Sequence, residues 1–504
     1  MSETQPAIAE KNRIFKITLV ISAFLSMIFL DQTGVSVTLT SIQNELALSS
    51  ATLSWMMNAY FLSLSACLLL FARLSDTLGI KNIFYTGIVV FMLASVGCAT
   101  ATSGPWIIAT RALQGIGASM GYATYLLIFN YQVAKKYRGR VLGTAAAFGA
   151  IFLALGPLIG GFFSSVMSWR FLFWLNVPIC AVCLFFTATA FRQDEHQHGP
   201  LLTDKLGLLF YLLAIVGLVC FLMEGSRLGW LNPYIVSAFA GSLAVFILFI
   251  YHEKKQHDPL VDLALFKNKV FTASIIILFG NYACVTSIVF WALWLQRVLG
   301  YSPLLAGIAL LPAGVPYIFS SRIGGILYDR HGARTPLLIG SLFFLAGFIE
   351  MTVVAPMQQY SWFMLGMLSM GIGWGFVRPC AILSGLNSVP IAHKSMATGM
   401  ISTMRQLGAA VGFALMYAVI STYENVSLTH IIQKNKLTVT TSDLNHLITQ
   451  ASANDSLSYL IPVIKTAHTH ALSWGMGVIS LLALLNLVLV IQYLHNDPEQ
   501  ADIS

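Results

Sequence analysis

Two ionisable residues lie deep inside long apolar stretches, where charge is costly. Asp31 lies about fourteen residues into one stretch and Arg111 about five into another; in antiparallel helices both would lie about 21 to 23 Å from one face of a core about 30 Å thick. A charge at mid-membrane costs about 2.5 to 3.5 kcal/mol, so it needs a partner or a purpose. A lone buried carboxylate tends to take up a proton, whereas a nearby guanidinium favours its ionised form. Asp31 and Arg111 therefore predict a site that binds and releases a proton, open to competition from a substrate.

The same pair has a structural interpretation, in which it locks two helices together and never changes charge. Asn58 and Gln114 lie at a similar depth and could hydrogen-bond to the pair, although such side chains also simply hold helices together. We predict that both line the substrate cavity. The coupling hypothesis further requires Asp31 to be reachable from a water-filled passage rather than to face lipid.

Two arginines in the second half form another group. Arg378 and Arg405 lie in apolar stretches that contain no acidic residue to offset them. If they face the substrate cavity, they favour a substrate with a carboxylate or another anionic group. In the alternative interpretation they cap backbone carbonyls or extend to the membrane surface.

A short motif occurs twice, at 72–81 and at 325–334, and each copy joins two apolar stretches. Each copy has an aspartate, a glycine three positions later and a closing cation. The residues that we assign to a cytoplasmic gate are Asp76, Gly79, Lys81, Asp329, Arg330, Gly332 and Arg334. The glycines permit a sharp turn, and each aspartate could bond a helix N-terminus or a cation of its own half. A solvated turn aspartate is the alternative.

The composition indicates a membrane environment for all these residues. Hydrophobic residues make up 57% of the 504 positions and charged residues only 10%, against about a quarter in soluble domains. Stretches long enough to cross a bilayer occur at 17–39, 52–71, 82–102, 106–129, 141–166, 171–191, 206–225, 233–251, 270–296, 304–327, 336–355, 361–389, 396–422 and 471–494. Backbone polar groups cannot stay unpaired in lipid, so the fold class is all-α integral membrane with fourteen transmembrane helices.

The distribution of charge predicts the orientation. The loops that share a side with the N-terminus carry most of the Lys and Arg residues, so both termini are expected to be cytoplasmic. The net charge of +8 is explained by this topology and does not require a nucleic-acid partner. All seven cysteines lie in or at the ends of apolar stretches, which argues against a disulfide framework, and no residue cluster suggests a metal site.

The repeat also predicts the domain organisation. Its copies follow the second and the tenth apolar stretch, so they are eight helices apart, whereas a protein of two six-helix halves would have its copies six helices apart. Two extra helices are therefore inserted between the halves. We predict a six-helix bundle over 14–191, two extra helices with cytoplasmic linkers over 192–262, and a second six-helix bundle over 263–495 that includes a weakly ordered periplasmic loop at 422–469.

Further motifs follow in order along the chain: LDQT at 30–33, RALQGIG at 111–117, GPLIGG at 156–161, WRFLF at 169–173 and GYSP at 300–303. Together they resemble the fourteen-helix drug/proton antiporter branch of the major facilitator superfamily. The resemblance implies the major facilitator fold and places Asp31 and Arg111 in proton coupling. It also identifies an antiporter motif at Gly156, Pro157, Gly160 and Gly161, where small residues allow close helix approach and the proline introduces a kink.

These features predict a proton-coupled antiporter that exports a small organic compound or drug by alternating access, working as a monomer in the bacterial inner membrane. No cofactor is expected beyond the proton gradient, and a periplasmic adaptor protein is a possible partner. A proton-coupled importer or exporter of an organic anion, such as a siderophore or a carboxylate metabolite, is the nearest alternative. From another class, a membrane sensor without transport activity stays open, whereas an enzyme would need polar residue clusters that the sequence does not show.

Overall fold

The computed structural model describes residues 4–191, 204–257, 259–390, 393–434 and 460–494. Across these ranges all regular secondary structure is helical. Within the described residues, 14 helices are long and apolar enough to cross a membrane, and their positions match the stretches predicted from the sequence. The predicted fold class, an all-α membrane protein, is confirmed.

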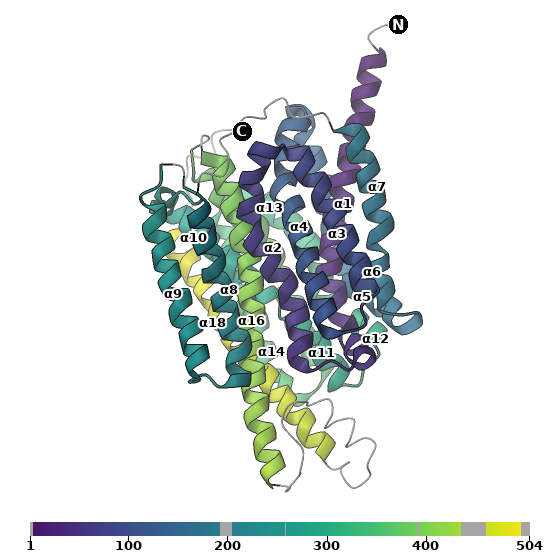
Figure 1. Ribbon diagram of the computed structural model, residues 1–504, viewed down its shortest axis with the longest axis vertical. Coiled ribbons are helices and arrows are strands. Elements are labelled where there is room, and N and C mark those ends of the chain that lie inside the picture. Colours follow the sequence, from purple (N-terminus) through teal and green to yellow (C-terminus); the bar gives the residue numbers. More distant parts are fainter. Residues whose placement is uncertain (1–3, 192–203, 258, 391–392, 435–459, 495–504) are drawn as a thin grey trace.

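The first six spans form a bundle of mutually packed helices (Figure 1). Their helices are α1 (Thr4–Leu46), α2 (Ser50–Leu78), α3 (Ile80–Ala99), α4 (Gly104–Gln132), α5 (Lys135–Val166), α6 (Arg170–Trp174) and α7 (Asn176–Ala190), with α6 and α7 sharing one span. Helix α1 packs along α5 and also touches α7, while α4 packs between α2 and α3. This arrangement places one face of α1 inside the bundle.

The last six spans form the corresponding second bundle. They comprise α10 (Lys269–Val285), α11 (Ile288–Arg297), α12 (Pro303–Ala309), α13 (Leu311–His331), α14 (Arg334–Val354), α15 (Tyr360–Asn387), α16 (Lys394–Lys434) and α18 (Leu460–Tyr493), with short 3₁₀ turns η1 (Leu263–Lys267) and η2 (Ala355–Met357). The first bundle meets the second where α5 packs on α12 and α13, and where α2 packs on α16.

Two helices between the bundles, α8 (Lys205–Leu228) and α9 (Pro233–Glu253), lie at one edge of the molecule (Figure 1). Helix α8 touches α2 of the first bundle and α16 of the second. The indole of Trp55 on α2 donates to Glu224 Oε1 on α8 at 2.7 Å, and the indole of Trp230 donates to Thr422 Oγ1 on α16 at 3.1 Å. The inserted pair thus bridges the bundles. Of its predicted linkers, 192–203 lies outside the described residues.

The two copies of the repeated motif form matching turns at the same end of the molecule. Gly79 ends α2 with a φ of +88° and Gly332 ends α13 with a φ of +73°. The amide of Gly79 donates to Ser75 O at 3.1 Å, and the amide of Gly332 donates to Tyr328 O at 2.9 Å. Such positive φ values favour glycine, so the prediction that these residues permit a sharp turn is confirmed.

The connection between the last two spans differs from the prediction of a weakly ordered loop over 422–469. Helix α16 continues to Lys434 and α18 already begins at Leu460, while 435–459 lies outside the described residues. Asn425 Nδ2 on α16 donates to Ser226 O on α8 at 3.0 Å, and His468 on α18 bonds Glu424 on α16. Low hydropathy indicates where a helix leaves the lipid, but side-chain contacts of this kind allow the helix to continue beyond it.

Candidate functional site

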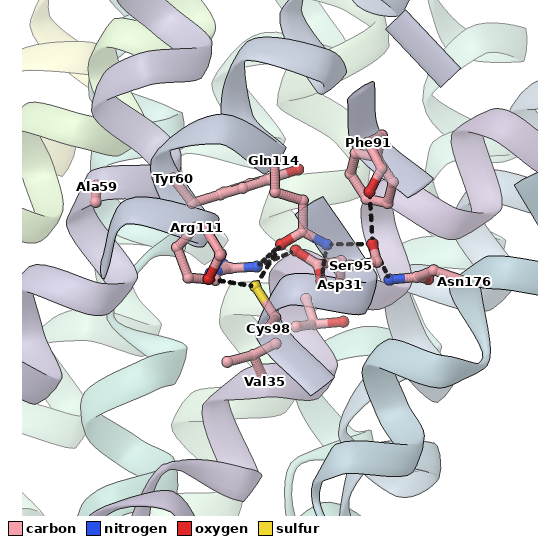
Figure 2. Close-up of polar contacts among 12 residues, drawn as sticks. Asp31, Val35, Ala59, Tyr60, Phe91, Ser95, Cys98, Arg111, Gln114 and Asn176 are labelled. Carbon is pink, nitrogen blue, oxygen red and sulfur yellow. Dashed lines mark hydrogen bonds and ion pairs between the residues drawn. The ribbon is translucent and has the colours of Figure 1, made fainter. Parts of the chain in front are cut away.

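Asp31 and Arg111 form an ion pair inside the first bundle. Arg111 Nη1 lies 2.6 Å from Asp31 Oδ2, and both side chains are fully buried. The guanidinium also lies 4.3 Å from the ring centroid of Tyr60 on α2. The proximity predicted from helix depth is therefore confirmed, and Figure 2 shows the pair with its neighbours.

Gln114 completes the surroundings of the ion pair. Its Oε1 accepts from Arg111 Nη1 at 2.6 Å, and its Nε2 donates to Asp31 Oδ1 at 3.2 Å and to Ser95 Oγ on α3 at 2.9 Å. Asn176 Nδ2 on α7 donates to the same Ser95 hydroxyl at 3.3 Å (Figure 2). One buried network therefore joins α1, α3, α4 and α7.

This network does not face the interface between the bundles. Phe29 contacts Arg378 of the second bundle, with the guanidinium carbon 5.2 Å from the ring centroid. Asp31 follows Phe29 by two residues, which is about 200° around an α-helix, so it points into the first bundle. The Asp31 carboxylate is fully buried in this conformation, so the solvent access that the coupling hypothesis requires is not seen here, and competition between a proton and a substrate stays a prediction. Gln114 lies with the ion pair, and the buried amide of Asn58 makes no hydrogen bond to it within the described residues.

The two arginines of the second bundle lie together among aromatic rings. Arg378 Nη1 donates to Tyr317 Oη on α13 at 2.9 Å, and Arg405 Nη2 donates to Tyr282 Oη on α10. Both guanidinium groups lie over the Tyr282 ring, with guanidinium carbons 5.5 and 4.7 Å from its centroid. No carboxylate lies within ion-pair distance of either arginine in the part of the chain that the structure describes. We refer to Arg378, Arg405, Tyr282 and Tyr317 as the arginine cluster.

The first bundle also contributes to this region. Tyr122 and Tyr125 on α4 are buried, lie edge to face with ring centroids 5.5 Å apart, and are close enough to interact electrostatically with Arg405. Trp374 on α15 lies 4.6 Å from Tyr317, measured between ring centroids. The arginine cluster therefore sits where the two bundles meet and is surrounded by aromatic side chains.

A cavity of about 270 Å³ lies between α2, α4 and α16, beside the first of the repeated turns. Its lining includes Arg73 and Asp76 at the first turn, Tyr122 on α4 and Ser402 on α16. Ser402 precedes Arg405 by three residues, so both lie on one face of α16. We call this cavity the vestibule, and on the predicted orientation it opens toward the cytoplasm.

At the opposite end the bundles are closed against each other. Gln296 Nε2 on α11 donates to Val37 O on α1 at 3.0 Å, and Arg297 Nη2 donates to Gln43 Oε1 at 2.6 Å. A Cβ at Gly161 on α5 would lie 2.4 Å from Pro303 O on α12. For the described residues, the contacts and the vestibule together indicate a conformation that is open at one end and closed at the other.

The antiporter motif on α5 packs against both bundles. A Cβ at Gly156 would lie 1.9 Å from Thr33 Oγ1, and a Cβ at Gly160 would lie 2.2 Å from Gly34 O, both on α1. Pro157 O in turn lies against Gly307 of α12, where a Cβ would approach it to 2.2 Å. The close helix approach predicted from these small residues is confirmed.

Pro157 links this motif to α1 in a way that the sequence analysis did not foresee. Proline has no N–H, so Leu153 O, four residues earlier, lacks its helical donor. Thr33 Oγ1 lies 3.1 Å from Leu153 O and 2.9 Å from Phe29 O, and its hydroxyl is shared between the two carbonyls. The signal was available, because a proline inside a buried helix leaves a carbonyl that some donor must satisfy.

The gate residues differ between the two copies of the motif. Lys81 Nζ donates to Phe191 O at the end of α7 at 2.9 Å, a favourable place for a cation at a helix C-terminus. Asp76 lines the vestibule. Asp329 and Arg330 are exposed, and within the described ranges neither forms an ion pair. In this conformation Asp329 fits the alternative interpretation of a solvated turn aspartate, and its role in a gate stays a prediction.

Comparison with known proteins identifies the family. A model of the Major Facilitator Superfamily matches residues 19–413. This chain belongs to that superfamily. Like its relatives, it is a multi-pass membrane transporter of small molecules and not an enzyme.

Major facilitator proteins similar to this chain include resistance proteins. The multidrug resistance protein Stp of Mycobacterium tuberculosis (strain CDC 1551 / Oshkosh) is 27% identical over 420 residues, which cover 83% of this chain and 78% of Stp. The methylenomycin A resistance protein of Bacillus subtilis (strain 168) is 30% identical over 417 residues, covering 80% and 87%. The solved D-xylose-proton symporter aligns over 96% of this chain and 98% of its own, with a TM-score of 0.64 at 14% identity, which supports the fold alone.

Proposed function

We propose that this chain exports a small organic compound from the cytoplasm in exchange for protons. The fully buried ion pair of Asp31 and Arg111 is the observation that carries the proposal. The names of the relatives, which refer to multidrug and methylenomycin A resistance, support export as the direction.

Protonation of Asp31 would change the energy of this conformation strongly. The carboxylate now offsets the charge of Arg111, whose Nε and Nη2 have no hydrogen-bond partner among the described residues. A neutral carboxyl would leave the guanidinium as an unpaired buried charge, which costs about 3 to 5 kcal/mol. Such a cost favours a different packing of α1 and α4. Since neither side chain meets solvent here, the protonation step belongs to another conformation of the cycle.

Helix α1 would transmit this change to the substrate region. It carries Asp31 on its inward face, Phe29 against Arg378 on the opposite face, and Thr33 bonded to Leu153 O on α5. If protonation of Asp31 shifts α1, then Phe29, which lies against the arginine cluster, and Thr33, which bonds α5 at the antiporter motif, move with it. On this view proton and substrate act on each other through one helix and not within one pocket.

The contacts between the bundles support alternating access. The outer end is closed by Gln296 and Arg297, while the vestibule is open at the end with the repeated turns. This conformation fits loading from the cytoplasm. In the opposite conformation, the turns that carry Asp76 and Asp329 would close the vestibule.

The test uses bacterial cells that lack their main drug exporters and express this protein. The cells are loaded with ethidium, a cationic dye, or with carboxyfluorescein, an anionic dye, and efflux of whichever dye the wild type exports is recorded with and without a protonophore. We expect Asp31→Asn to abolish protonophore-sensitive efflux while it reaches the membrane in normal amount. The control is Glu45→Gln, which removes a partly exposed carboxylate that pairs with Arg170 at 2.8 Å. Normal efflux by Asp31→Asn, or equal loss in the control, would overturn the proposal.

A further inference from the structure

The arginine cluster has the features of a binding site for a small molecule. Arg405 is 95% buried, and its Nε has no hydrogen-bond partner among the described residues. Arg378 lies beside it over the shared Tyr282 ring. Arg405 is buried and Arg378 is half-buried, and guanidinium groups without a carboxylate are costly in such surroundings, because tyrosine rings and hydroxyls offset only part of the cost.

We propose that the arginine cluster binds the anionic group of the transported compound, so that the substrate is an aromatic or otherwise apolar organic anion. This proposal rests on the proposed transport function and adds the chemical class of its cargo. A carboxylate or sulfonate can accept two parallel hydrogen bonds from a guanidinium. A cationic compound would instead meet two uncompensated positive charges.

The surroundings fit the body of such a ligand. Tyr317 and Trp374 form one aromatic wall and Phe29 lies across the bundle interface, so an aromatic ring can stack where the charge is bound. Tyr122 connects this region to the vestibule, which gives access from the predicted cytoplasmic side. Because Phe29 belongs to α1, a ligand bound in the arginine cluster would also contact the helix that carries Asp31.

The structural alternative is that the arginines only stabilise the fold. It makes a different prediction, because relief of a charge without a carboxylate partner should offset the loss of each arginine's hydrogen bond to a tyrosine hydroxyl, whereas loss of a purely structural bond should destabilise the protein. We expect Arg378→Gln and Arg405→Gln to unfold at the wild-type temperature or above it in the absence of ligand. A strong loss of stability in both variants would favour the structural role and overturn the proposal.

Binding is tested on the purified full chain in detergent, without a proton gradient, by equilibrium dialysis. The probes are 2-naphthoate, 2-naphthalenemethanol and 2-naphthylmethylammonium, which share one ring system and differ in charge. We expect the acid to bind about tenfold or more tightly than the alcohol, and the cation to show no saturable binding. Arg378→Gln and Arg405→Gln should each weaken binding of the acid about tenfold or more, whereas Arg227→Gln, at an exposed arginine on α8, should not.

The outcome separates this proposal from the transport mechanism. Binding of the acid that survives in Asp31→Asn, together with lost efflux, supports both. Selective binding of the acid without any proton-driven efflux supports the ligand class and rejects the coupling. Equal binding of acid and cation, or unchanged binding of the acid in both arginine variants, overturns the ligand class whatever the efflux result.

Discussion

The hydrogen bond between Thr33 and Leu153 O is open to a quantitative test. Pro157 has no N–H, so α5 lacks the helical hydrogen bond to Leu153 O. The buried hydroxyl of Thr33, on the neighbouring α1, donates to Leu153 O at 3.1 Å instead. Thr33→Val keeps the shape of the side chain and removes that donor. Leu153 O then becomes a buried acceptor without a partner.

The expected magnitude follows from two general values. An unsatisfied buried acceptor costs about 1 to 3 kcal/mol, whereas side-chain hydrogen bonds between membrane helices average about 0.6 kcal/mol and reach about 1.7. Since the Thr33 hydroxyl is shared with Phe29 O, we expect Thr33→Val to lower the free energy of unfolding by about 1 to 1.5 kcal/mol. In a Pro157→Ala background the alanine N–H can bond Leu153 O, so the same substitution should cost less than about 0.5 kcal/mol.

The assay is reversible unfolding in mixed micelles, followed by circular dichroism, of wild type, both single variants and the double variant. The control is Thr124→Val on α4, because the buried Thr124 hydroxyl bonds Met120 O at 2.8 Å within its own uninterrupted helix. We expect that control to cost less than about 0.5 kcal/mol, since Met120 O keeps its helical donor. Additivity of the cycle within about 0.3 kcal/mol, or an equal loss in the control, would refute the reasoning.

Two further predictions use the same unfolding measurement. Arg111→Gln leaves Asp31 buried without its cation and should cost about 3 to 5 kcal/mol, and adding Asp31→Asn should recover part of that loss. If the double variant is less stable than Arg111→Gln alone, the positive charge of Arg111 is not what stabilises the buried Asp31 carboxylate. Gly156→Ala places a Cβ 1.9 Å from Thr33 Oγ1 and should cost about 1 to 3 kcal/mol. Gly143→Ala, on the same helix with open space around it, should instead stabilise by about 0.5 to 1 kcal/mol, and equal effects would contradict close packing as the cause.

Much of the architecture could be predicted from the sequence. The bilayer sets a minimum length for an apolar helix, so the runs of apolar residues alone locate each of the spans found in the described part of the chain. The duplicated motif predicted two equivalent turns, and Gly79 and Gly332 adopt positive φ in both. Helix depth, counted in residues from the membrane surface, was enough to predict that Asp31 and Arg111 lie close together.

The side toward which a residue faces could not be predicted in the same way. Lipid and protein interior are both apolar, so the sequence of a transmembrane helix carries only a weak signal of its orientation about its own axis. Packing of α1 on α5, α7 and α11 fixes that orientation. It turns Asp31 into the first bundle and Phe29 toward the second, which separates the ion pair from the arginine cluster.

The sequence by itself therefore determined the positions of the spans, the two matching turns and the proximity of Asp31 to Arg111, because these depend on distance along the chain and on the thickness of the bilayer. Only the tertiary structure decided that Arg378 and Arg405 share one aromatic site, that Thr33 satisfies the carbonyl freed by Pro157, and that α16 continues beyond the lipid. These outcomes depend on which helices become neighbours, since the donors, rings and charges that meet come from segments far apart in the chain.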